Sequence, residues 1–284
     1  MSQVSKKTLN IRGRLLDLST PVVMGIMNIT PDSFYAGSRV VATDEIVEKA
    51  GKMLAEGAGI IDIGGYSTRP GAREVSEDEE GDRIESAVEP LAKFFPEVVI
   101  SVDTFRARVA ERGICKGAHL INDVAGGTLD DAMFETVARL RVPYILMHMR
   151  GTPQTMNSLT TYERLVPDIL RDLRAKLVLL QSKGVADVII DPGFGFAKTT
   201  AQNFELMREL AQFKSLGYPV LAGISRKTAI YKTLNISPEE ALNGTTVLNT
   251  LALERGASIL RVHDVKQAVE AVKLWMAAGN YPNK

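Results

Sequence analysis

Eight short apolar runs, each followed by a polar loop and a longer stretch, constrain the fold of this chain more than any other feature. The runs are VVMGIM (22–27), IIDIGG (60–65), VVISVD (98–103), HLINDV (119–124), YILMHM (144–149), VIIDPG (188–193), VLAGIS (220–225) and ILRVHD (259–264). They are continuous rather than alternating, which is typical of parallel strands buried on both faces. The intervals between them leave room for crossover helices.

The longer stretches carry apolar residues on one helical face. Such faces are formed by Ile84, Val88, Leu91 and Phe95, by Leu165, Ile169, Leu173 and Leu177, and by Val265, Val269, Val272 and Met276. Their spacing is that of an amphipathic helix. The sequence Ser-Pro-Glu-Glu at 237–240 predicts a helix start, because a cap residue precedes a first-turn proline and two acids.

Eight such units predict an α/β fold, a (β/α)8 TIM barrel, with an open doubly wound sheet as the alternative. The leading segment TLNIRGRLLDLS (8–19) alternates enough to predict a short N-terminal β-hairpin across the bottom of the barrel. No long low-complexity linker interrupts the series, so we expect residues 1–284 to form a single domain.

Composition narrows the function classes. Thirty-four basic residues balance 34 acidic ones, which argues against nucleic acid as a partner. The first residues, MSQVSKKTLN, carry no apolar run of signal-peptide length, and no run in the sequence reaches membrane-spanning length. We therefore expect a cytoplasmic protein with no membrane partner. Cys115 is the only cysteine, which excludes a disulfide framework, and its amphipathic surroundings predict a small apolar filler.

Polar residues follow the predicted strands at their carboxyl ends, where barrel enzymes carry their sites. In chain order they are Asn28, Thr68, Arg69, Asp103, Asn122, His148, Asp191, Ser225, Lys227, Arg261 and His263. Any single one could be a cap or loop residue, but the series gathers at one pole of the barrel. The sequence therefore predicts a functional site at that rim.

These residues lie in segments that resemble the dihydropteroate synthase family of folate biosynthesis. The segments are MNITPDSF (27–34), DIGGYSTRPGA (62–72), SVDT (101–104), INDVAGG (121–127), LMHMRGTPQTM (146–156), DPGFGF (191–196), GISRKT (223–228) and RVHDV (261–265). They occur in family order from about residue 20 to 275. The resemblance implies a transferase that joins 6-hydroxymethyl-7,8-dihydropterin pyrophosphate to p-aminobenzoate, a sulfonamide target and a homodimer.

The resemblance implies three subsites. In the pterin subsite, carboxylates accept the N–H donors of the ring; its residues are Asp103, Asn122, Asp191, Lys227, Met147 and Phe196, with Ile26 and Val124 as further apolar walls. The pyrophosphate subsite comprises Asn28, Thr68, Arg69, Arg261 and His263, and Asn28 resembles the residue associated with Mg²⁺. The p-aminobenzoate subsite comprises Phe34, Thr68, Pro70, Phe196, Ser225, Arg226 and Lys227, completed by loops 29–40 and 65–74.

The catalytic residues implied are Asp103, Lys227, Arg261 and His263. No residue set resembles an activated nucleophile, so we expect a dissociative substitution rather than covalent catalysis. The helix beginning near Asp264 would add its positive end beside the leaving group.

The chain departs from the family at Tyr66, where Glu is commoner, and in loop one, where Phe-Tyr-Ala-Gly-Ser replaces Phe-Ser-Asp-Gly-Gly. Three alternatives remain open at this point. They are a pterin-binding methyltransferase of the same superfamily, a non-catalytic pterin-binding paralogue, and a Schiff-base aldolase that uses Lys227. Arg226 beside Lys227 argues against the aldolase.

Overall fold

The computed structural model describes residues 6–29, 39–66 and 74–280, without the side chains of residues 39–42 and 280. A parallel sheet of eight strands forms its centre, in the order β8-β7-β6-β5-β4-β3-β10-β9. The strands are β3 (Val22–Asn28), β4 (Ile60–Gly64), β5 (Val99–Asp103), β6 (Leu120–Asp123), β7 (Tyr144–Met147), β8 (Val188–Asp191), β9 (Leu221–Ala222) and β10 (Ile259–Val262). A parallel bridge between Ile190 and Val220 joins the two outer strands, so the sheet closes into the predicted TIM barrel.

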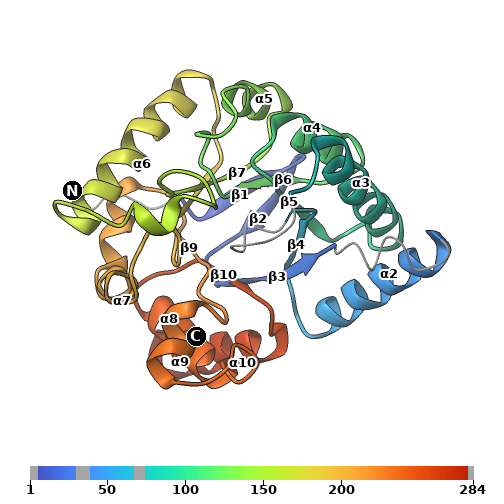
Figure 1. Ribbon diagram of the computed structural model, residues 1–284. Helices are drawn as coiled ribbons and strands as arrows, with labels where there is room; N and C mark the ends of the chain where they lie inside the picture. The colour runs from blue at the N-terminus through green and yellow to red at the C-terminus, as the bar shows by residue number, and fades with distance from the viewer. Residues whose placement is uncertain (1–5, 30–38, 67–73, 281–284) are drawn as a thin grey trace.

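Helices surround this barrel on its outside (Figure 1). They are α2 (Arg39–Ala55), α3 (Glu77–Phe94), α4 (Ala107–Cys115), α5 (Met133–Leu140), α6 (Leu165–Ser182), α7 (Thr200–Arg208), α8 (Thr228–Leu234), α9 (Leu242–Glu254) and α10 (Val265–Trp275), with the short turns η1 (Met156–Ser158), η2 (Leu210–Leu216) and η3 (Met276–Asn280). The predicted apolar faces of α3, α6 and α10 pack on the outward side chains of the strands. No helix within the described ranges is long and apolar enough to cross a membrane.

The barrel interior changes from apolar to polar along the strands. Its first layer takes one side chain from each strand, all at most 3% exposed: Met24, Ile60, Val99, Leu120, Ile145, Ile189, Leu221 and Ile259. Because strand side chains alternate, the residues two positions later face inward again. They are Ile26, Asp62, Ser101, Asn122, Met147, Asp191, Gly223 and Arg261. The sequence therefore places polar groups above a sealed apolar floor.

The predicted N-terminal hairpin closes the floor from below. Strands β1 (Thr8–Ile11) and β2 (Arg14–Asp17) pair antiparallel and cross the centre of the barrel in Figure 1. Leu9 and Ile11 are at most 2% exposed and pack against the first interior layer. Burial of these side chains keeps water out of that end of the barrel, so the barrel opens only at the carboxyl ends of its strands.

Two local predictions are wrong. Helix α9 begins at Leu242 rather than at Pro238, and residues 238–241 form a turn. The carbonyls of Pro238 and Glu239 accept hydrogen bonds from the Arg226 guanidinium at 2.9 and 2.6 Å, which gives them partners outside a helix. Cys115 is exposed instead of buried, because it lies beyond the buried face that Val109, Ala110, Gly113 and Ile114 form on α4.

Candidate active site

Arg261 joins two carboxylates at the mouth of the barrel. Its Nε donates to Asp62 Oδ2 at 2.6 Å, and its Nη2 donates to Asp103 Oδ2 at 2.5 Å. Asn122 Nδ2 donates to the same Asp62 oxygen at 2.9 Å. Four strands thus contribute to one network, and Asp62 is fully buried beneath it. Asp103, Asn122 and Arg261, which the sequence predicted as site residues, are brought together here.

Burial and charge oppose each other in this network. Burial raises the pKa of Asp103 to about 7, although the positive charge of Arg261 favours the carboxylate. Burial also opposes the charge of Arg261, but Asp62 and Asp103 outweigh it and raise the pKa of the guanidinium. Arg261 therefore stays a cation that pairs with both carboxylates.

Asp191 and Lys227 form the opposite side of the mouth. Asp191 is 6% exposed, and its Oδ1 accepts a hydrogen bond from Gly193 N at 2.7 Å. Its Oδ2 lies over Gly223, 3.8 Å from the point that a Cβ would occupy there. Burial raises the pKa of Asp191. One oxygen thus holds the turn after β8, and the other faces the barrel mouth.

Lys227 lies across the ring of Phe196, with Nζ 4.1 Å from the ring centroid. Burial, with the charge of Arg261, lowers the pKa of Lys227 to about 8. The charges of Asp191 and Asp103 oppose this shift. The guanidinium of Arg226, on which the sequence argument against an aldolase relied, pairs with Asp264 instead.

A small apolar cluster forms one wall of the site. It comprises Val124, Ala125, Met147, Met149, Met156, Phe196 and Ala197, with Phe105 and Leu129 packed against it. It is separate from the main core and from the barrel floor. Three of the predicted pterin walls, Val124, Met147 and Phe196, are thus neighbours, beside the polar groups of β5, β6 and β8.

The outer rim carries Asn28, Ser225 and His263. Ser225 Oγ is 3.0 Å from His263 Nδ1, and it accepts the backbone N–H of His263 at 3.2 Å. Asn28 Oδ1 lies over Gly64, 3.3 Å from the point that a Cβ would occupy, with Asp103 Oδ2 3.6 Å from the same point. A side chain at position 64 would crowd both groups, so glycine keeps the space between them open.

Arg226 points away from the mouth. Its guanidinium forms two hydrogen bonds with Asp264, Nε to Oδ2 at 2.9 Å and Nη2 to Oδ1 at 2.8 Å, besides its bonds to the carbonyls before α9. Its backbone has a φ of 53°, so the chain turns sharply between Ser225 and Lys227. The structure thus gives Arg226 a role in anchoring this loop, and a contact with substrate stays a prediction.

Two residues of the site region were not among the predicted ligands. Asp62 shares Arg261 with Asp103, and its signal in the sequence is an acid within an otherwise apolar run. Lys198 is buried under the loop 191–197 and contacts His148, which is itself 1% exposed and does not line the mouth. The sequence carries no comparable signal for Lys198, because its burial depends on how that loop folds back.

Several predicted residues lie outside the described part of the chain: Phe34, Thr68, Arg69 and Pro70. Their roles stay predictions.

Tyr66, the departure from the family pattern, lies just before one of these gaps. Its ring meets Phe105 edge to face at 5.3 Å, and the Arg106 guanidinium lies 5.3 Å from its centroid. Arg106 in turn pairs with the buried Glu80 at 2.7 Å. Phe105 and Arg106 thus hold the Tyr66 ring, and Glu80 fixes Arg106 in turn.

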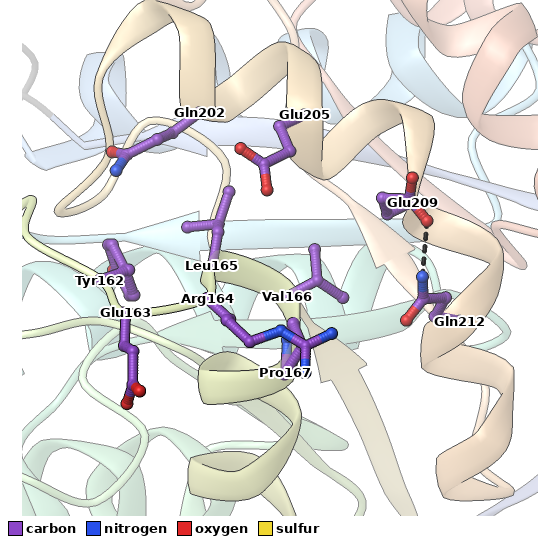
Figure 2. Close-up of a pocket in the computed structure, with 10 residues that line it drawn as sticks. All are labelled: Tyr162, Glu163, Arg164, Leu165, Val166, Pro167, Gln202, Glu205, Glu209 and Gln212. Carbon is purple, nitrogen blue, oxygen red and sulfur yellow. Dashed lines mark hydrogen bonds between the residues drawn. The ribbon is translucent and has the colours of Figure 1, made fainter.

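A surface pocket of about 500 Å³ lies elsewhere, between the start of α6 and the helices α7 and η2 (Figure 2). Glu163, Glu205 and Glu209 line it beside Arg164, and none of the predicted site residues is among its lining residues. Its acidic lining does not suit a pyrophosphate, since like charges repel. The barrel mouth therefore remains the candidate active site.

Comparison with known proteins identifies the family. Residues 24–263 match the family of pterin-binding enzymes. Dihydropteroate synthase of Escherichia coli K12 is 42% identical over 265 residues, which cover 93% of each chain. The Yersinia pestis dihydropteroate synthase with a sulfonamide drug superposes with a TM-score of 0.89 at 40% identity, covering 97% of this chain and 100% of that one.

The Xanthomonas albilineans dihydropteroate synthase with 4-aminobenzoic acid gives the same TM-score of 0.89 at 38% identity, over 98% of this chain and 100% of that one. Both the sequence match and the fold match extend over nearly the whole chain, and they include every strand that carries a site residue. The chain therefore belongs to the dihydropteroate synthase family of pterin-binding enzymes.

Proposed function

We propose that this chain condenses 6-hydroxymethyl-7,8-dihydropterin pyrophosphate with p-aminobenzoate, releasing pyrophosphate and 7,8-dihydropteroate. The observation that carries the proposal is the network at the barrel mouth, where Asp103, Asn122 and Arg261 meet opposite Asp191 and Lys227. Family membership supports it independently, because the relative from Escherichia coli K12, which matches over 93% of each chain, is a dihydropteroate synthase.

The pterin subsite uses the polar second layer of the barrel and Asp103, which lies two residues beyond that layer on β5. A 2-amino-4-oxo pterin presents a row of N–H donors, which Asp103 and Asp191 accept, while Asn122 reads the remaining edge. Lys227 donates to ring acceptors, and Met147 and Phe196 cover the faces of the ring. The buried network supports this assignment, because a low dielectric strengthens such hydrogen bonds.

The pyrophosphate subsite lies at the outer rim. Arg261 and His263 alternate on the last strand and its extension, so both face the mouth, and Val265 begins α10 nearby. We assign Asn28, Thr68 and Arg69 to the same subsite.

No group of three His, Cys, Asp or Glu that could hold a metal ion occurs within the described residues. The single amide oxygen of Asn28 nevertheless fits Mg²⁺, which binds mainly through water and substrate phosphates. Bound there, Mg²⁺ would neutralise charge on the leaving group.

The p-aminobenzoate subsite follows the loop after β9. Ser225 and Lys227 border it with Phe196, and loops 29–40 and 65–74 complete it through Phe34, Thr68 and Pro70. A solved dihydropteroate synthase from Xanthomonas albilineans holds 4-aminobenzoic acid, which supports a site for this substrate in the fold. We retain Arg226 in this subsite as the anchor of the loop.

The reaction we infer is a dissociative substitution. The bond between the pterin methylene and the pyrophosphate oxygen breaks, and the conjugated ring nitrogen delocalises the resulting cation. Asp103 and Asp191 stabilise that cation, while Arg261 and His263 stabilise the departing pyrophosphate. The amine of p-aminobenzoate then forms the new carbon–nitrogen bond and releases one proton. Closure of the two loops would exclude water, which otherwise yields the alcohol.

We also infer that the chain acts as a single barrel domain over residues 1–284 and as a homodimer. Val247 and Leu251, one turn apart on α9, are 52% and 37% exposed, which supports an apolar contact face there. A cytoplasmic location stays a prediction from the sequence.

The deciding experiment measures pyrophosphate release from the pterin pyrophosphate in Mg²⁺ buffer, with and without p-aminobenzoate. Formation of dihydropteroate only when both substrates are present is the expected result. Tight pterin binding without turnover would instead identify a non-catalytic paralogue. Methyl transfer from methyltetrahydrofolate to a corrinoid would identify the methyltransferase.

A further inference from the structure

A buried lysine lies directly beneath the loop that carries Asp191 and Phe196. Lys198 is 8% exposed, although ammonium groups are rarely buried without compensating partners. Its Nζ donates to Gly193 O at 2.8 Å and to Phe196 O at 3.0 Å, and it lies 3.2 Å from His148 Nδ1. Burial lowers the pKa of Lys198 to about 7, and the three acceptors match the three N–H groups of its ammonium form.

His148 acts as an acceptor because it is uncharged. Burial and the neighbouring charge of Lys198 lower the pKa of His148 to about 2, so the imidazole is neutral and Nδ1 can hold a lone pair toward the lysine. The backbone N–H of His148 also donates to Asp191 O at 3.0 Å. The end of β7 is thus tied both to the end of β8 and to the lysine under the following loop.

The loop itself depends on this anchoring. Gly193 has a φ of +75°, and a Cβ there would lie 2.0 Å from His148 O, so the loop is pressed against the end of β7. Ala197 has a φ of 50°, which a residue with a side chain rarely adopts. Its carbonyl accepts a hydrogen bond from Tyr162 at 3.0 Å. Such a backbone persists only where its surroundings fix it.

The two anchored carbonyls belong to residues that control the site. Gly193 donates its N–H to Asp191 Oδ1 at 2.7 Å, which orients that carboxylate. Phe196 presents its ring to Lys227, with 4.1 Å between Nζ and the centroid. Lys198 therefore connects to Asp191 through Gly193 and to Lys227 through Phe196, without reaching the mouth itself.

We propose that Lys198 is a positioning residue for substrate binding, which holds the loop 191–197 against His148 so that Asp191 and Phe196 face the pterin and p-aminobenzoate. This inference rests on the proposed function, because the substrate roles of Asp191 and Phe196 do. Lys198 touches neither substrate, since its ammonium is enclosed by the loop.

The test compares two methionine variants with matched burial. Lys198→Met removes the ammonium and keeps a side chain of similar length. Lys176→Met does the same on α6, where Lys176 is 9% exposed and pairs with Asp172 at 3.0 Å. We expect Lys198→Met to raise KM for both substrates about 10-fold or more, because small misplacements of binding groups have large effects. Lys176→Met should leave both KM values unchanged while lowering Tm to a similar extent.

Equal losses of Tm in the two variants, with unchanged KM in both, would overturn the proposal. Should Lys198→Met not fold, His148→Gln and His148→Leu provide the second test. Glutamine keeps an acceptor for Lys198 and should retain the KM values, whereas leucine should raise them, and identical behaviour of the two would refute the proposal. Failure of the proposed function is distinct, because the unmodified chain would then form no dihydropteroate.

Discussion

Charged side chains in the mouth of the barrel form ion pairs with residues of other strands. Arg261 is shared by Asp62 and Asp103, and Asp62 Oδ1 and Ser101 Oγ find no hydrogen-bond partner among the residues that the structure describes. A buried carboxylate is stable only when it is paired, and Asp62 pairs with Arg261. We therefore infer that Asp62 serves chiefly to fix the position of the Arg261 guanidinium. This arrangement orients the guanidinium before a substrate arrives.

Replacement of Asp62 by asparagine should therefore weaken catalysis through Arg261. The variant loses one charged hydrogen bond to Arg261 Nε, which is worth about 1.5–3 kcal/mol, so we expect kcat/KM for the pterin pyrophosphate to fall about 10-fold or more. Steady-state kinetics checks this. Ser101→Ala, at the neighbouring interior position, is the control, since Ser101 Oγ has no partner there. Equal activity of the two variants would contradict the role of Asp62.

The ionisation of Lys227 predicts a pH dependence. Its pKa is lowered from 10.5 to about 8 by burial, so the ammonium that we propose as a donor to the pterin is present below pH 8 and is lost as the pH rises through 8. Pterin affinity should thus decline by about 10-fold above that pH, the scale of a lost charged hydrogen bond. Calorimetric titration across this range measures it.

Lys227→Met supplies the control for this titration. It has no ammonium to lose, so its weaker affinity should not change near pH 8. A decline of the same size in Lys227→Met would assign the titration to the ligand or to another group.

At the scale of elements, the loops after the strands are fixed by side chains from neighbouring units. Strand β9 has two residues, Leu221 and Ala222, and the chain then turns at Arg226, between Ser225 and Lys227. The start of α10 anchors that turn through Asp264. A turn replaces the predicted helix start at 237–240. The carbonyls of Pro238 and Glu239 in this turn accept hydrogen bonds from the Arg226 guanidinium.

Substitution of Arg226 and of its partner Asp264 can distinguish two possible roles of Arg226. If Arg226 positions the loop through Asp264, Asp264→Asn should raise KM for p-aminobenzoate as Arg226→Ala does, by about 3- to 10-fold. If Arg226 instead binds the benzoate carboxylate, only its own replacement should raise this KM. Measured KM values for both variants decide between the roles.

The hairpin of β1 and β2 contributes stability rather than chemistry. Leu9 is fully buried against the barrel floor, so Leu9→Ala should lower the free energy of unfolding by about 2–4 kcal/mol. Leu15, which is 69% exposed on the same hairpin, gives the control, and Leu15→Ala should change stability by less than about 0.5 kcal/mol. Urea unfolding measures both, and KM should stay unchanged in each.

At the scale of the whole molecule, the chain combines an apolar floor, a polar mouth and an outer ring of helices. The helices α8, α9 and α10 lie together on one side of the barrel (Figure 1) and expose Leu234, Val247, Leu251 and Leu274. Exposed apolar side chains on neighbouring helices favour a subunit contact on this side of the barrel.

Introduction of charge on this side should therefore dissociate the proposed homodimer. Val247→Lys places an ammonium in the contact face, so its mass in light scattering should be that of a monomer. Val178→Lys on α6, at a position 59% exposed, should leave the mass of the dimer unchanged. A dimer that withstands Val247→Lys would place the contact elsewhere.

The sequence alone determined the barrel, the pole that carries the candidate site and most of the polar residues gathered there. These follow from local periodicity: buried strands give continuous apolar runs, and the first polar residue after a buried run marks the carboxyl end. Asp103, Asn122, Asp191, Lys227 and Arg261 were found in this way, and the structure brings them together.

Tertiary structure alone decided how these groups pair. Asp62 and Arg261 are 199 residues apart and meet because the barrel closes, which no local pattern encodes. Arg226 turns outward although its neighbours face inward, because a backbone φ of 53° and Asp264 on the next unit direct it. Lys198 is buried because its loop folds back over it. Periodicity fixes which face a residue occupies, whereas closure of the barrel fixes its partners.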